Sequence, residues 1–196
     1  HNSIHEMALA ALDLCDGPLV PIGLSMGGYV ALEMARLAPQ RMAAMALLSS
    51  NCRDDSAENQ RQRQQAIALA KNAGFQGVTR HLMPRLLSEA ALQDEAIIAD
   101  VLSMAAAIGR IGSVNQQTAI MGRRAQHATL ARFDAPVLVL CGNVDVLTPP
   151  NMSVEMADLA PQAKLCLLNG IGHLSSIEAP EAVFHALESL FELAAD

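Results

Sequence analysis

One serine in this chain stands at a spacing that suits nucleophilic chemistry. Ser25 lies in Gly23-Leu24-Ser25-Met26-Gly27, between an apolar run over 19–24 and a helix-like stretch that begins near Gly27. G-x-S-x-G at a strand-to-helix turn is typical of a nucleophile elbow, in which a strained turn exposes the serine hydroxyl. Only glycine is expected to fit at the flanking positions Gly23 and Gly27, because a Cβ there would clash with nearby backbone. The motif predicts an acyl-transfer enzyme with Ser25 as its nucleophile.

Two other interpretations of this turn stay open at this point. A serine between glycines after a strand often forms an ordinary turn, because G-x-S-x-G also occurs by chance. A nucleotide-binding turn fits the residues poorly. Gly23, Gly27 and Gly28 do not give G-x-G-x-x-G, since Ser25 stands where a second glycine would let a pyrophosphate approach. A catalytic serine therefore requires that the chain also supply a base and an acid.

His173 is the strongest candidate for the base that such a serine needs. It ends the segment Asn169-Gly170-Ile171-Gly172-His173, just beyond a strand-like run over 165–168. Catalytic histidines are often held in loops that follow strands, although many loop histidines are merely solvated. The other histidines lie at the terminus or in helix-like stretches: His1, His5, His81, His127 and His185.

Asp145 is the matching candidate for the acid that orients the histidine. A continuous apolar run over 136–141 precedes Gly142-Asn143-Val144-Asp145, and such runs suit a parallel strand that is covered on both faces. Taken alone, Asp145 suits a turn or a cap. Thr148-Pro149-Pro150, which comes next, predicts a helix N-cap followed by proline in the first turn.

Three segments of the chain together resemble the α/β-hydrolase superfamily. They are GLSMGGYVA at 23–31, PVLVLCGNVD with TPP at 136–150, and GH followed by EAPE at 172–181. The resemblance covers nearly the whole chain, and serine, aspartate and histidine follow in the order typical of that fold. It implies Ser25 as nucleophile, Asp145 as acid and His173 as base. It also implies that the Met26 N–H forms half of the oxyanion hole.

The remaining elements alternate between strand and helix on both sides of a long helical stretch. The sequence predicts strands over 19–24, 42–48, 137–141 and 163–168, and helices over 4–14, 27–37, 149–159 and 180–193. This alternation predicts an α/β protein with a mostly parallel sheet and helices on both faces. In terms of the resemblance, the chain is a partial α/β hydrolase. Residues 1–50 and 125–196 form its core, and residues 51–124 form an inserted all-helical cap.

The middle stretch has a second interpretation as a surface helical hairpin with no part in substrate choice. Its apolar residues are expected to lie mostly in a core, with a few facing the substrate: Met83, Leu86, Leu87, Met104, Ile108 and Met121. Because aromatic residues make up only 3% of the chain, the pocket is expected to be aliphatic. Such a pocket favours small or aliphatic acyl groups.

Composition narrows the partners and the compartment. A chain of 196 residues with 52% hydrophobic residues has room for one domain with a sizeable core. The net charge of −7 argues against a nucleic-acid partner, and no apolar run approaches the length of a membrane span. The chain shows no signal-peptide pattern, its cysteines lack metal or redox spacing, and no residue cluster implies a cofactor. We expect a cytoplasmic protein that acts on a small-molecule acyl substrate.

The elbow comes earlier here than in the family that the chain resembles. Only one predicted helix precedes it, so the first strands of the sheet are missing, together with the loop that gives a second oxyanion N–H. Losing one oxyanion donor typically costs about 100- to 1,000-fold in turnover. We expect one of three situations: a fragment of a longer protein, pairing of the open 19–24 edge with a second copy, or a truncated and largely inactive product.

The leading functional hypothesis is a serine hydrolase of the esterase kind that works through an acyl-enzyme. A lactone hydrolase, a carbon–carbon bond hydrolase or a cofactor-free perhydrolase would use the same triad. A non-catalytic binding protein on the same scaffold is an alternative of a different class. The three triad residues argue against a binding protein, and the missing oxyanion loop argues for it.

Overall fold

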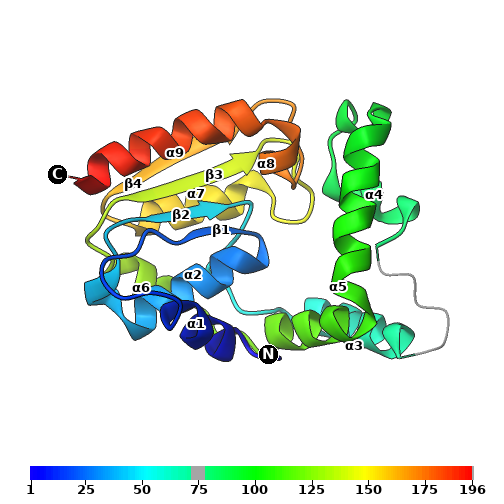
Figure 1. Cartoon of the computed structure of the whole chain (residues 1–196), viewed down its shortest axis with the longest axis horizontal. Coiled ribbons are helices and arrows are strands. Elements are labelled where there is room, and N and C mark those ends of the chain that lie inside the picture. The colour runs from blue at the N-terminus through cyan, green and yellow to red at the C-terminus, as the bar shows by residue number, and fades with distance from the viewer. Residues whose placement is uncertain (72–77, 196) are drawn as a thin grey trace.

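The computed structural model describes residues 1–71 and 78–195, and these form a parallel sheet with helices on both faces (Figure 1). The sheet has the strand order β1-β2-β3-β4, and every neighbouring pair is parallel. Its strands are β1 (Ile22–Leu24), β2 (Met45–Leu48), β3 (Val137–Gly142) and β4 (Ala163–Leu168). The predicted α/β class and parallel sheet are therefore confirmed.

The two central strands bury side chains on both of their faces. Along β2, Met45 and Leu47 belong to one apolar cluster, whereas Ala46 and Leu48 belong to another on the opposite face. The first cluster packs against α1 (Ile4–Leu12), α2 (Met26–Leu37), α6 (His127–Ala131) and α7 (Pro150–Leu159); the second packs against α9 (Pro180–Ala195). Continuous apolar runs mark these strands because neither face is left to water.

The first strand begins later than the sequence predicts. Leu19 still pairs with Met42 through an isolated bridge, but the regular ladder starts only at Ile22. Pro21 lies between them and has no N–H to donate, so the ladder is interrupted there. Among the described residues, β1 forms one edge of the sheet, and the prediction that something covers this edge stays a prediction.

The middle stretch, residues 51–124, is called the insertion below. Its described part contains α3 (Ala57–Ala70), α4 (Met83–Leu86) and α5 (Glu95–Met121), with short 3-10 turns and no strand. Figure 1 shows α5 standing beside the sheet body, with α3 crossing its lower end. The helical nature of the insertion matches the prediction, and its role as a cap is taken up under the proposed function.

Helix α5 is the one described helix that is long and apolar enough to cross a membrane, judged by length and composition alone. Gly109 interrupts it with a left-handed backbone conformation (φ 64°, ψ −177°) that glycine adopts easily. Neither arm on its own reaches the roughly 20 residues that a membrane-spanning helix needs. The expectation that the chain has no membrane partner stays an expectation.

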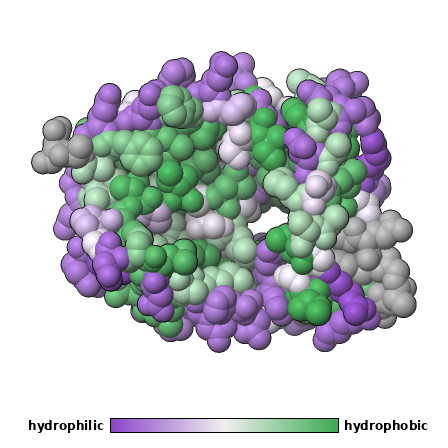
Figure 2. Space-filling model, in the orientation of Figure 1, coloured by the Kyte–Doolittle hydropathy of each residue, from purple (hydrophilic) through white to green (hydrophobic). Residues whose placement is uncertain are grey.

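The apolar residues of the insertion divide into two groups. Met83 and Leu87 are buried in a cluster with Ile98 and Val101, which confirms the expected core positions. Met104 and Ile108 are almost half exposed, so the same expectation is wrong for them. The reason is that the middle of α5 stands away from the sheet body, as the opening between them in Figure 2 shows.

The two ends of the insertion are joined at their base by a buried ion cluster. Asp55 lies where the chain enters the insertion, and Arg123 lies where it returns to the core. The Asp55 carboxylate is fully buried and pairs with Arg123 and with Arg63. Arg123 also lies over the ring of Tyr29 in α2, with 4.4 Å between the guanidinium carbon and the ring centroid. The cluster therefore fixes the insertion to the core at α2.

Candidate active site

Ser25 occupies a strained turn between β1 and α2. Its φ of 53° lies in the left-handed region, which a residue with a side chain adopts only when its surroundings impose it. Two hydrogen bonds hold the turn: the Ser25 N–H donates to the Leu48 carbonyl (2.9 Å), and the Ser50 hydroxyl donates to the Ser25 carbonyl (2.9 Å). Both partners come from the end of β2, so the neighbouring strand holds the strained serine in place.

The glycines around this turn are needed at two positions, one of which differs from the prediction. A Cβ on Gly23 would lie 2.3 Å from the backbone of Gly27, and one on Gly28 would lie 2.3 Å from the Ser50 hydroxyl oxygen. A Cβ on Gly27 would meet nothing within 4 Å, so the predicted clash at Gly27 is wrong. The crowded partner of Gly23 is the backbone of Gly27, and the side-chain direction of Gly27 points into free space.

His173 and Asp145 are joined by a hydrogen bond inside the protein. The Nδ1 atom of His173 lies 2.8 Å from Oδ2 of Asp145, and both side chains are almost completely buried. Asp145 follows β3 and His173 follows β4, which are neighbours in the sheet. The carboxyl ends of parallel strands meet at one edge, so the loop of Ser25 after β1 lies at this same edge.

The Asp145 carboxylate is held by more donors than its histidine. The N–H groups of Leu147 and Thr148 donate to Oδ1 (2.8 and 3.0 Å), and the Thr148 hydroxyl donates to Oδ2 (2.7 Å). Burial raises the pKa of Asp145, but the bonds from His173 and Thr148 outweigh it and leave the pKa below its ordinary value. Asp145 is therefore an ionised partner for the imidazole.

Thr148 differs from its predicted role as a helix cap. Pro149 occupies the N-cap position of α7, and no side chain caps the helix. The Thr148 hydroxyl is directed to Asp145 instead, and it lies 3.4 Å from Nδ1 of His173. A buried carboxylate attracts the nearest donor more strongly than an exposed helix end does, because water cannot replace that donor. The T-P-P pattern gave no signal of this second role.

The Ser25 hydroxyl is half-buried and makes no hydrogen bond to His173 within the described part of the chain. Nε2 of His173 also has no protein partner there, whereas Nδ1 is bonded to Asp145. Catalytic hydrogen bonds are often long in free enzymes and tighten when substrate binds, so this spacing is compatible with a serine–histidine pair.

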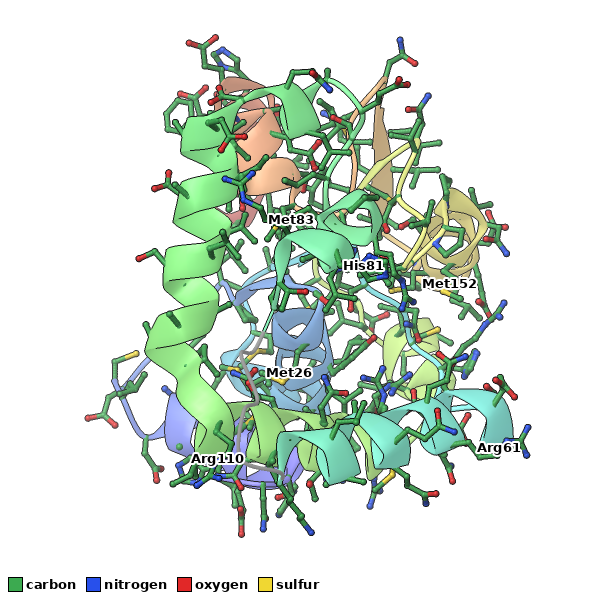
Figure 3. The ribbon with its side chains drawn as sticks, turned by 90° about the vertical axis from the view of Figure 1, so that its right-hand side faces the viewer. Met26, Arg61, His81, Met83, Arg110 and Met152 are labelled. Carbon is green, nitrogen blue, oxygen red and sulfur yellow. The ribbon has the colours of Figure 1, made fainter. Side chains whose placement is uncertain are left out.

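Met26 begins α2 and presents an unpaired backbone N–H. No acceptor in the described structure binds it, whereas the Gly28 N–H already donates to the Ser25 carbonyl (3.0 Å). The first N–H groups of a helix carry partial positive charge and attract anions. Seen from the side of the insertion, Met26 lies behind the segment that carries His81 and Met83 (Figure 3).

The insertion contacts both sides of this site. Near the serine, Met26 packs with Ala119 and Ile120 from the end of α5. Near the histidine, the Leu86 carbonyl accepts hydrogen bonds from the N–H groups of His173 (3.1 Å) and Leu174 (3.2 Å). The loop that carries His173 is therefore bonded directly to the insertion.

Glu178 adds a second link that sequence reasoning missed. Its Oε2 atom accepts hydrogen bonds from the N–H of Ser88 in the insertion (2.9 Å) and from the N–H of Gly172 (3.1 Å). Its Oε1 atom is buried without a partner in the described structure. The sequence contained Glu178 within a recognised motif, but nothing in the motif indicated which distant segment it contacts.

Comparison with known proteins identifies the family. A family model described as the alpha/beta hydrolase fold matches residues 3–180, nearly the whole chain. The chain belongs to the α/β-hydrolase family. The resemblance predicted from the three motifs is confirmed, and the chain is a hydrolase of this family.

Individual relatives share the fold along almost the whole chain. A thermophilic esterase from Thermogutta terrifontis is 29% identical, with a TM-score of 0.91 over 98% of this chain and 73% of its own. A Mycobacterium tuberculosis protein that carries the name non-heme bromoperoxidase BpoC is 29% identical over 89% of this chain and 68% of its own. A pimeloyl-[acyl-carrier protein] methyl ester esterase from Neisseria meningitidis is 26% identical over 91% of this chain and 72% of its own.

Proposed function

We propose that this α/β hydrolase cleaves a carboxylic ester of a small molecule through Ser25, His173 and Asp145. One observation carries the proposal. A buried Asp145–His173 hydrogen bond of 2.8 Å lies at the same sheet edge as a serine held at a φ of 53°. Strain at a serine and a fully buried imidazole–carboxylate pair are both costly, and they persist where chemistry uses them. The esterases among the relatives support the same reaction class.

The proposed reaction proceeds through an acyl-enzyme. Nε2 of His173 takes the proton of the Ser25 hydroxyl while Oγ bonds to the ester carbon, and the carbonyl electrons move onto oxygen. The Met26 N–H donates to this oxyanion. The bond from carbon to the alkoxy oxygen then breaks, and the alcohol leaves with the proton from His173. Water returns a proton to His173 as its oxygen bonds to the acyl carbon, and the acid and the free serine are released.

Asp145 acts on the imidazole in this scheme. Its bond to Nδ1 fixes the tautomer that leaves Nε2 free to accept a proton, and its charge stabilises the imidazolium that forms. The bonds from Thr148 and Leu147 keep the carboxylate ionised and in place. The loops after β3 and β4 thus supply a prepared base for Ser25.

We propose that the insertion, residues 51–124, is the cap of this site and that residues 1–50 and 125–196 form its core. The bonds from Leu86 and Glu178 to the His173 loop support this role, as does the packing of Met26 against α5. A cap of Leu, Ile, Met and Ala suits a small aliphatic acyl group. Lactones are cyclic esters and fit the same chemistry.

The decisive experiment labels the active serine. The purified chain is treated with a fluorophosphonate probe and, separately, with a panel of p-nitrophenyl esters of increasing acyl length. We expect stoichiometric labelling and ester turnover, both lost in Ser25→Ala and both kept in Ser189→Ala, which alters a half-buried serine on α9. Labelling that survives Ser25→Ala excludes Ser25 as the nucleophile. Absence of labelling in the parent chain would favour the non-catalytic alternative.

A further inference from the structure

Three metal-binding side chains meet at a place outside the proposed active site. Cys52, His127 and Glu155 each offer one ligand atom, and these atoms all lie within 4.8 Å of one another. The three residues are far apart in the sequence, so no motif of closely spaced ligands indicates the site. Thiolate, imidazole and carboxylate are the three ligand types that zinc binds in proteins.

The fold brings the three residues together from three elements. Cys52 follows β2, His127 is the first residue of α6, and Glu155 lies on α7. The Gln126 N–H donates to the Cys52 carbonyl (2.7 Å), which places the start of α6 directly against Cys52. The Cys52 residue is 1% exposed, whereas the side chains of His127 and Glu155 are 42% and 26% exposed. A buried thiol therefore faces a pair that solvent can reach, so an ion has a path to it.

The spacing of these atoms suits a small tetrahedral ion. Nε2 of His127 lies 3.1 Å from Oε1 of Glu155. On a tetrahedral zinc ion with ordinary bond lengths, a nitrogen and an oxygen ligand lie ~3.4 Å apart, and a sulfur lies ~3.6 Å from either. We propose that Cys52, His127 and Glu155 bind one zinc ion, with water as the fourth ligand. Side-chain movements of about 1 Å bring the three atoms to these distances.

The surroundings of the trio fit this assignment. The second carboxylate oxygen of Glu155 accepts a hydrogen bond from Arg53 (2.7 Å), which orients the carboxylate and leaves Oε1 for the ion. The Arg53 side chain is 45% exposed and can turn toward solvent if the ion's charge repels it. Binding releases the Cys52 thiol proton to solvent, so the ion is held by a thiolate, and a proton shared between His127 and Glu155 is displaced.

The test uses the full chain after chelator treatment, with Cys15→Ser and Cys166→Ser as background to remove the two less buried thiols. We expect one Zn²⁺ per chain by calorimetry and a rise in melting temperature with added Zn²⁺. Co²⁺ should give the near-ultraviolet band of a thiolate–cobalt bond and the visible spectrum of four-coordinate cobalt. Mg²⁺, which prefers oxygen ligands, should give none of these changes.

Two variants and one control decide the outcome. Cys52→Ser should abolish the thiolate–cobalt band, and His127→Gln should weaken Zn²⁺ binding by at least about tenfold. His127 is partly exposed, so its variant serves even if Cys52→Ser does not fold. His185→Gln breaks another His–Glu pair, with Glu188 2.9 Å away and no thiol contact, and should leave binding unchanged. A band that persists in Cys52→Ser, full affinity in His127→Gln, or no Zn²⁺ uptake by the parent chain would overturn the proposal.

Discussion

The chain buries two aspartates whose carboxylates have different partners. Both the Asp55 and the Asp145 side chains are completely inaccessible to solvent. Asp55 pairs with Arg63 and Arg123, which stay charged at every relevant pH. Asp145 pairs with His173 and with the neutral hydroxyl of Thr148. One cluster therefore has fixed charges, and the other contains a group that gains and loses a proton.

The difference shows how a buried carboxylate serves structure or chemistry. A carboxylate between two guanidinium groups can only hold segments together, and Asp55 does so at the base of the insertion. A carboxylate beside an imidazole stabilises the protonated imidazole and so supports proton transfer. Burial is the same in both clusters, so the partners decide the outcome. The following substitutions test this distinction.

The largest expected effect is on turnover in Asp145→Asn. An amide at this position can donate to Nδ1 and hold the wrong imidazole tautomer, so kcat for an activated ester should fall by about 10³- to 10⁴-fold. Urea unfolding should show a much smaller change in stability than Asp55→Asn does. Turnover within tenfold of the parent would remove Asp145 from the mechanism.

Asp55→Asn should give the converse result, a large loss of stability. It leaves two arginines at the base of the insertion without their counter-charge, and breaking a buried pair typically costs about 3–5 kcal/mol. The measurement is the urea midpoint and slope, with kcat per folded molecule determined below the transition. We expect kcat to stay within a few fold of the parent. A loss of stability below about 1 kcal/mol would contradict the structural role of this cluster.

Glu33 sharpens the comparison because it has partners of both kinds. Its carboxylate binds Arg36 (2.6 Å), Gln126 (2.6 Å) and His5 (3.0 Å). Burial raises its pKa, but the bonds from these groups outweigh it and lower the pKa from 4.5 to about 2. The folded state therefore favours the ionised form, and this stabilisation is complete above pH 4.5 and lost as the pH falls toward 2.

The measurement compares the parent chain with Glu33→Gln across that range. At pH 7 the variant should be less stable by ~1.5–3 kcal/mol, the range for hydrogen bonds to charged groups. The difference should shrink as the pH falls from about 4.5 to about 2, where the parent's carboxylate becomes protonated. A difference that stays constant over this range shows that Glu33 is not held ionised by its partners.

The smallest expected effect tests the link between the insertion and the His173 loop. Glu178→Ala removes the acceptor that Ser88 and Gly172 share, so the His173 loop loses part of its support. Small misplacements of a catalytic group cost up to about 100-fold, and we expect a loss of about tenfold in kcat. Glu188→Ala on the exposed face of α9 is the matched control. Unchanged kcat in Glu178→Ala would show that the Leu86 bonds suffice.

Most of the elements could be predicted because their signals are local. The apolar run that became β3 is buried at every position, as a strand covered on both faces requires. The start of β1 could not be placed from hydrophobicity, because Pro21 interrupts the ladder without interrupting the apolar pattern. Exposure of Met104 and Ile108 was missed because helical spacing alone does not say whether another element covers that face.

The candidate site divides in the same way. The sequence by itself determined the strand-turn-helix around Ser25, the loops that carry Asp145 and His173, and their order along the chain. Tertiary structure alone decided that Thr148 contacts Asp145 and that Glu178 contacts Ser88. Local patterns set backbone conformation over a few residues. Contacts between distant residues depend on how whole elements pack, and a single sequence does not specify those distances.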